Sequence, residues 1–158
     1  MFREVARKKQ ALSEAECVEI LKAAPRGVLS VLGDDGYPYG TPINHWYDAE
    51  TGRLYFHGGA KGHKLDAMRA SDKVSFVCTD GGRPSDEGWW LVFRSVVVFG
   101  RVTFVTDAAE TLRIARELTK KFIDDDEYFE RELQEAGGRT LVFYLTPEHM
   151  TGKRVSER

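Results

Sequence analysis

Hydrophobic and polar positions alternate along much of the chain in the pattern of short β-strands. Such strands are predicted for residues 27–32, 39–47, 53–57, 73–79 and 140–146. Residues 89–105 form a longer β-favouring stretch, which predicts two strands or one strand with a bend near Arg94 and Ser95. Asp35-Gly36 is a hairpin turn signal. The first three strands are therefore expected to form a β-meander.

Helical patterns occur between some of these strands. Ser13 and Glu16 have the spacing of a capping box, which predicts a helix over residues 14–24. Further helices are predicted for residues 65–70, for residues 107–122 after the cap Asp107, and for residues 124–135. The inner stripe of the 107–122 helix is expected to be Ala108, Leu112, Ala115 and Leu118.

The order of these elements shows no regular alternation of strand and helix. A doubly wound parallel sheet is therefore not expected, and the pattern favours a mainly β fold, an antiparallel barrel of about six or seven strands with peripheral helices. The length of 158 residues predicts one domain over residues 1–158. Residues 1–12 are expected to form an N-terminal arm and residues 150–158 a polar C-terminal tail.

Composition and charge limit the kinds of partner that the protein is expected to bind. Lys and Arg total 23 against 25 Asp and Glu, a formal charge of −2, so no nucleic acid partner is expected. No apolar run approaches the roughly 20 residues that cross a bilayer, and no signal peptide is recognisable, so no membrane partner is expected. The two cysteines, Cys17 and Cys78, are predicted to be buried thiols. These features predict a cytoplasmic protein.

Several familiar motifs of catalysis and nucleotide binding are missing. The sequence has no Walker loop, no dinucleotide-type glycine spacing after a first strand, and no Gly-x-Ser-x-Gly elbow. The four histidines do not form a helical metal-binding pair and the cysteines supply no CxxC, so no metal is expected.

Residues 54–64 (LYFHGGAKGHK) carry the most specific chemistry in the chain. A predicted strand ends at His57, glycines expose backbone N–H groups, two lysines follow, and a helix is expected to begin soon after. Exposed amides, a helix N-terminus and lysine charges together suit a phosphate monoester. The alternative is a surface loop that is glycine-rich for turning and basic for solubility.

Residues 36–44 (GYPYGTPIN) place two prolines within one predicted strand. Each proline removes a hydrogen-bond donor from the ladder, so this strand is expected at an edge or a bulge. Its backbone is then free to bind another partner, such as a ring with imide-type N–H and C=O groups. The alternative is an irregular edge strand without a ligand.

These two segments, followed by residues 94–100 (RSVVVFG) and 150–153 (MTGK), stand in an order that resembles a known family. The family is that of the pyridoxamine 5'-phosphate oxidase-like FMN-binding split barrels, in particular the nitroimidazole-resistance (Nim-like) branch. The resemblance extends from about residue 13 to residue 153. It implies an antiparallel split β-barrel and a homodimer that binds FMN at the subunit interface.

The resemblance also assigns roles to residues. Residues 41–44 would lie along the isoalloxazine ring, residues 56–58 would border the ring and the ribityl chain, and the two lysines would hold the 5'-phosphate. The implied cofactor contacts are Thr41, Pro42, Ile43, Asn44, Phe56, His57, Gly58, Gly59, Ala60, Lys61 and Lys64, with Arg94 and Ser95 contributed by the partner subunit.

The implied function is that of an FMN-dependent oxidoreductase that reduces a small organic acceptor with a nicotinamide or another reductant as donor. His57 is a candidate catalytic residue, as a proton donor or a substrate-orienting group, and alternatively a cofactor neighbour without a proton role. No Arg-Leu-x-Pro segment follows the last strand, so vitamin B6 oxidation is not expected. The alternatives are a non-catalytic protein that binds flavin, or haem through His57 or His63, and a deazaflavin-dependent reductase of the same fold.

Overall fold

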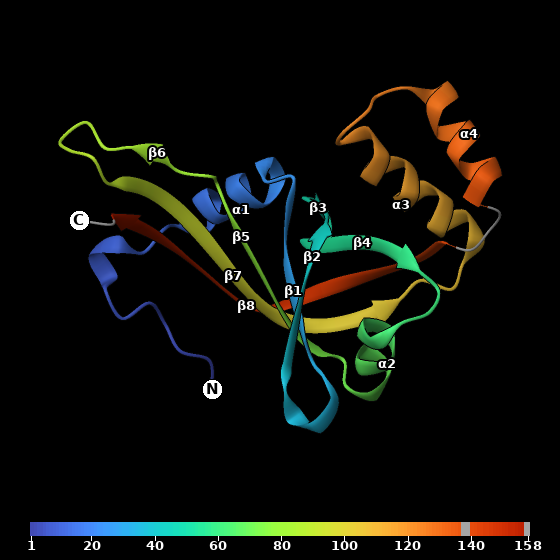
Figure 1. Cartoon of the computed structure of the whole chain (residues 1–158), viewed down its shortest axis with the longest axis horizontal. Helices are drawn as coiled ribbons and strands as arrows, with labels where there is room; N and C mark the ends of the chain where they lie inside the picture. Colours follow the sequence, from blue (N-terminus) through green and yellow to red (C-terminus); the bar gives the residue numbers. More distant parts are fainter. Residues whose placement is uncertain (137–139, 157–158) are drawn as a thin grey trace.

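The computed structural model describes residues 1–136 and 140–156, which form one curled, eight-stranded sheet with helices around its rim (Figure 1). The strands are β1 (Arg26–Leu32), β2 (Pro38–Asn44), β3 (Trp46–Asp48), β4 (Arg53–Gly59), β5 (Lys73–Thr79), β6 (Arg83–Pro84), β7 (Leu91–Phe104) and β8 (Thr140–Ser156). The helices are η1 (Lys8–Gln10), α1 (Glu14–Ala23), η2 (Asp34–Gly36), α2 (His63–Ala70), α3 (Ala108–Lys120) and α4 (Asp126–Ala136).

The strands pair in the order β2-β1-β5-β7-β8-β4-β3, and β6 adds to β7. Each pairing within the described part of the chain is antiparallel. The predicted mainly β, antiparallel fold with peripheral helices is therefore confirmed. Strands β2 and β3 lie at the two ends of this order, and within the described residues they do not pair with each other. The sheet therefore curls without closing into a full barrel. Strand β2 lies opposite β4 across the remaining opening, which we call the split.

The predicted β-meander of the first three strands is wrong. The 39–47 strand is broken at His45, which separates β2 from β3. Strands β1 and β2 form a hairpin at one end of the sheet, and β3 and β4 form another at the opposite end. The break has a physical cause, because the fully buried His45 ring bonds the Leu21 carbonyl at 2.7 Å instead of extending a strand.

Strands β7 and β8 form the spine of the sheet. β7 is one continuous strand with a register shift between Phe99 and Gly100, where Pro147 of β8 lies opposite Gly100. A proline is tolerated at such an irregularity, so β8 continues through it. The predicted C-terminal tail is therefore wrong for residues 150–156, which pair with β7. Residues 157–158 lie outside the described residues.

The helix caps follow the sequence signals. Ser13 and Glu16 form the predicted capping box at the start of α1. The Asp107 side chain accepts a hydrogen bond from the Glu110 amide at 2.8 Å and caps α3. None of the described helices is long and apolar enough to cross a membrane.

The inner stripe predicted for α3 is only partly correct. Leu118 is buried together with Ile114 against the sheet, whereas Ala108 and Leu112 are exposed. The turn of the helix places Ile114 and Leu118 against Tyr55. The stripe that runs through Leu112 faces α4 instead, and it becomes relevant to the site below.

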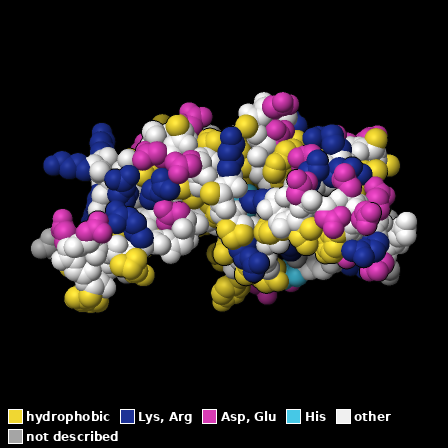
Figure 2. Space-filling model, turned by 90° about the horizontal axis from the view of Figure 1, so that it is seen from above, with side chains coloured by type: hydrophobic (Ala, Val, Ile, Leu, Met, Phe, Trp, Pro, Cys, Tyr) yellow, Lys and Arg dark blue, Asp and Glu magenta, His cyan; other side chains and the backbone are white. Residues whose placement is uncertain are grey.

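The core lies on the concave side of the sheet. Phe56 packs between Phe76 and Phe143, with ring centroids 5.5 and 5.2 Å apart. Both cysteines are buried free thiols, which confirms that prediction. Acidic and basic side chains are mixed over the face that carries α3 and α4, with hydrophobic atoms between them (Figure 2).

Candidate functional site

The fold brings the two informative sequence segments to the same end of the molecule. Residues 41–44 lie on β2. Residues 58–64, here called the glycine-lysine loop, run from the end of β4 into the start of α2. The His63 ring at the start of α2 stacks on Tyr39 of β2, with centroids 4.4 Å apart. The loop therefore lies beside the start of β2, and residues 41–44 continue from there along the same strand.

Strand β2 presents an unpaired edge to this split. Within the described residues it pairs only with β1, as the two prolines predicted. Ile43 is buried in the core and Pro42 is exposed on the outer face, while Thr41 and Asn44 are half-buried. The Thr41 hydroxyl oxygen is buried without a hydrogen-bond partner among the described residues. A ligand along this edge would meet the backbone.

The loop after β4 provides space and positive charge. A Cβ atom built on Gly58, Gly59 or Gly62 would meet nothing within 4 Å, and Gly62 has a φ of +131° that favours glycine. Lys61 is exposed and Lys64 is half-buried, and neither is paired with a described carboxylate. Burial lowers the pKa of Lys64. Unneutralised ammonium groups beside open backbone fit a phosphate.

Side chains alternate across β4, so neighbouring residues face different environments. Phe56 points into the core, where no ligand reaches its ring, and only its backbone borders the loop. His57 points to the opposite face, toward α3 and α4. Burial and the nearby Lys64 ammonium lower the pKa of His57. Its imidazole is therefore neutral at pH 7 and suited to hydrogen bonding rather than to delivering a proton as imidazolium.

A groove of about 520 Å³ opens between α3, α4 and the ends of β4 and β8. Ala108 and Leu112, which were expected in the core, belong to its wall. The lining residues are His57, Ala108, Thr111, Leu112, Ala115, Thr119, Phe129, Glu132, Leu133 and Thr140. The helical spacing of the apolar positions of α3 is the only sequence signal that indicates this groove.

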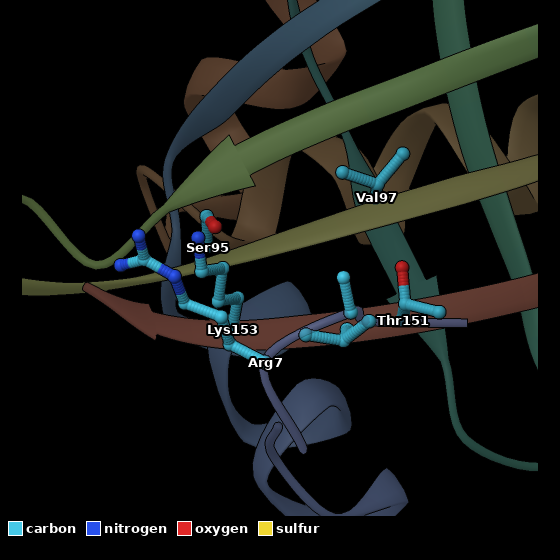
Figure 3. A pocket seen from close by; sticks show the side chains of 7 residues that line it. Arg7, Ser95, Val97, Thr151 and Lys153 are labelled. Atoms are coloured by element: carbon cyan, nitrogen blue, oxygen red, sulfur yellow. The ribbon is translucent and has the colours of Figure 1, made fainter. Parts of the chain in front are cut away.

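Arg94 and Ser95 lie away from the two lysines within one chain. Arg94 is at the α1 end of the sheet, where it bonds Asp80 at 2.8 Å and Glu19 at 3.4 Å. Ser95 lines a second cavity of about 450 Å³, into which Arg7 and Lys153 also point (Figure 3). One chain therefore does not bring these two residues to the glycine-lysine loop.

Sequence reasoning missed a buried polar cluster behind the split. Lys121, just after α3, donates hydrogen bonds to the carbonyl oxygens of Ala24 at 2.6 Å and His45 at 2.8 Å. Burial lowers the pKa of Lys121 to about 8. Burial and the Lys121 charge lower the pKa of His45 to about 4. These hydrogen bonds connect the end of α3 to the β2–β3 break. No local sequence motif predicts this cluster.

Among residues 1–136 and 140–156, no group of three or more His, Cys, Asp or Glu side chains could hold a metal ion.

A family model described as pyridoxamine 5'-phosphate oxidase matches residues 13–154. No curated protein matches the chain.

Similar solved structures include a proposed 5-nitroimidazole antibiotic resistance protein from Bacteroides thetaiotaomicron. It is 19% identical, has a TM-score of 0.77, and the alignment covers 92% of this chain and 87% of that one. A FAD-binding protein from Mesorhizobium loti is 24% identical, with a TM-score of 0.64 and coverage of 93% and 98%. A FAD and haem binding protein from Mycobacterium smegmatis is 22% identical, with a TM-score of 0.72 and coverage of 95% and 74%. These similarities show the fold.

Proposed function

The chain belongs to the pyridoxamine 5'-phosphate oxidase family, and from this membership we propose that it binds the FMN portion of a flavin and acts as an oxidoreductase. The observation that carries the proposal is the unneutralised pair Lys61 and Lys64, beside open glycine backbone and next to the free edge of β2. The similar structures named as FAD-binding proteins support a flavin on this fold.

The proposed contacts use the chemistry of each segment. Lys61 and Lys64 bind the phosphate through charge-assisted hydrogen bonds, together with backbone amides of residues 58–62. The free backbone edge of residues 41–44 orients the isoalloxazine ring through its N–H and C=O groups. When bound, the flavin supplies the electron transfer, and the protein contributes orientation and electrostatics. His57 holds a hydrogen bond near the ribityl-phosphate end, and its catalytic role remains a prediction.

The substrate proposed is a small organic acceptor. The similarity to the structure of the proposed nitroimidazole resistance protein favours a reducible ring compound, with a nicotinamide or another reductant as electron donor.

Absorption spectroscopy of the purified protein, followed by titration of the apoprotein with FMN, tests the proposal. We expect flavin bands or saturation near one flavin per chain. A protein that is indifferent to FMN contradicts it. A Soret band would instead identify haem, and a deazaflavin spectrum would identify the other alternative.

A homodimer is part of the proposal, because apolar side chains remain exposed on the outer face of the sheet beside the N-terminal arm. The register aligns Pro42, Val28, Val77, Val97 and Thr151 across five strands. Val28 is 40% exposed although its strand, β1, is paired on both sides, with β2 and with β5. A second copy packed on this face would cover it and would bring the Ser95 cavity, with its basic side chains, to the other chain's flavin.

Replacing Val28 with glutamate should dissociate this dimer, because a charge would be buried in the centre of the interface. Size-exclusion chromatography with light scattering should show twice the monomer mass for the wild type at micromolar concentration and the monomer mass for Val28→Glu. Ile123→Glu, at a similarly exposed apolar residue outside this face, is the control and should remain dimeric. A wild-type monomer would rule out the dimer.

A further inference from the structure

The groove between α3 and α4 begins where the proposed phosphate site ends. His57 lines the groove and lies near enough to Lys64 for that ammonium to lower its pKa. Thr140, also in the lining, pairs with Gly59 of the glycine-lysine loop. A ligand held by Lys61 and Lys64 could therefore extend from the phosphate directly into the groove.

The position of the groove decides which part of a ligand reaches it. In a flavin, a five-carbon ribityl chain separates the ring from the phosphate. If the ring lies along β2 and the phosphate at the lysines, the groove borders the phosphate end. An acceptor bound there would be too far from the ring to exchange electrons by direct contact. The occupant is therefore better explained as a continuation of the cofactor beyond its phosphate.

The lining of the groove fits a neutral nucleoside. Leu112, Phe129 and Leu133 provide apolar contact for a flat base. The Thr111 and Thr119 hydroxyls already donate to the Asp107 and Ala115 carbonyls, at 2.8 and 2.9 Å, so toward a ligand they present acceptor lone pairs.

The Glu132 carboxylate adds two further acceptor oxygens. Ribose hydroxyls and an exocyclic amino group are donors that match these acceptors. Among the described residues, the lining includes no lysine or arginine, and the phosphates are assigned to the two lysines of the loop.

Ion pairs connect the two helices that form the groove. Arg116 of α3 bonds Asp126 at 3.1 Å and Glu130 at 3.0 Å on α4. The same guanidinium lies 4.9 Å from the centre of the Phe129 ring. These contacts connect α3 and α4 beside the groove. The volume of about 520 Å³ is within the range of roughly 300–1,000 Å³ typical of small-molecule sites.

We propose that this groove binds the adenosine portion of FAD, with the pyrophosphate held by Lys61 and Lys64. The proposal rests on the proposed flavin site and extends it from the mononucleotide to the dinucleotide. It predicts that the protein distinguishes FAD from FMN through residues of α3 and α4.

Titration of the apoprotein with FMN and with FAD, followed by flavin fluorescence, tests this. The wild type should bind FAD at least about tenfold more tightly than FMN, because the groove adds apolar burial and hydrogen bonds. Ala115→Trp fills the groove and should abolish that difference while leaving FMN affinity unchanged. Ala109→Trp, on an exposed position of α3 outside the groove, is the matched control and should keep it.

The outcomes separate the two proposals. If neither flavin binds, the proposed function fails and this inference fails with it. If FMN and FAD bind equally to wild type, or if Ala115→Trp weakens both equally, flavin binding stands and the adenosine site is wrong. An Ala115→Trp variant that keeps its preference for FAD but raises KM for the acceptor would make the groove a substrate site. Glu132→Gln, a milder change, should weaken FAD alone by about threefold to tenfold.

Discussion

Replacing both Lys61 and Lys64 with alanine should weaken FMN binding by at least about 100-fold. A charge-assisted hydrogen bond to a phosphate contributes on the order of 1.5–3 kcal/mol, so removal of two costs about 3–6 kcal/mol. No other lysine or arginine lies within residues 54–64, so no cation of this segment substitutes for them. Fluorescence titration with FMN at two ionic strengths measures the effect, and the double variant should also lose most of the salt dependence.

The matched control is Lys22→Ala/Lys120→Ala, which removes the same charge from two exposed lysines at helix ends away from the loop. It should change FMN affinity less than about twofold, because charges beyond a Debye length are screened. Equal weakening in the two double variants would mean that net charge, and not the loop, attracts the cofactor.

The stability of the apoprotein gives an independent view of Lys64. Burial lowers the pKa of this ammonium, and it forms no ion pair with the described residues, so it is desolvated without compensation. Such a group lowers stability when no anion is bound, which is the arrangement expected of a binding residue rather than a structural one. The loss of FMN affinity in the double variant is thus not expected to come from unfolding.

The sequence predicted the fold correctly where local signals, such as caps and strand patterns, determine the structure. The capping box at Ser13, the cap at Asp107 and the 73–79 strand are confirmed at or within a residue of their predicted bounds. The edge position of β2 also followed from local chemistry, because each of its prolines removes a ladder donor.

The incorrect predictions concern places where contacts between residues distant in the sequence determine the structure. No signal near His45 in the sequence predicts that its ring is buried against the Leu21 carbonyl. A continuous strand over residues 39–47, and with it the β-meander, was therefore predicted. Similarly, Pro147 reads as the end of a strand, and only the facing irregularity at Gly100 lets β8 continue. The candidate site could be proposed from the sequence because its loop is contiguous. The groove could not, since its wall combines α3, α4 and two strand ends.

Acidification from pH 7 to pH 4 should destabilise the protein through His45. Burial and the Lys121 charge lower the pKa of this imidazole from its ordinary 6.5 to about 4. The unfolded chain therefore binds a proton between these values and the folded protein does not, so the free energy of unfolding falls as pH decreases through this window. The loss attributable to His45 is on the order of 3 kcal/mol, and it levels off below about pH 4.

Urea unfolding at pH 7, 5.5 and 4.5 measures this, with His45→Gln as the test variant. Glutamine keeps a donor for the Leu21 carbonyl and does not titrate, so the variant should lose stability at pH 7 but show a flatter pH dependence than the wild type. His63→Gln, at an exposed histidine at the start of α2, is the matched control and should follow the wild-type curve closely. Parallel curves for wild type and His45→Gln would show that the carboxylates, and not the buried imidazole, govern acid stability. A flatter pH dependence of the free energy of unfolding in His45→Gln would therefore show that the neutral His45 ring stabilises the β2–β3 break.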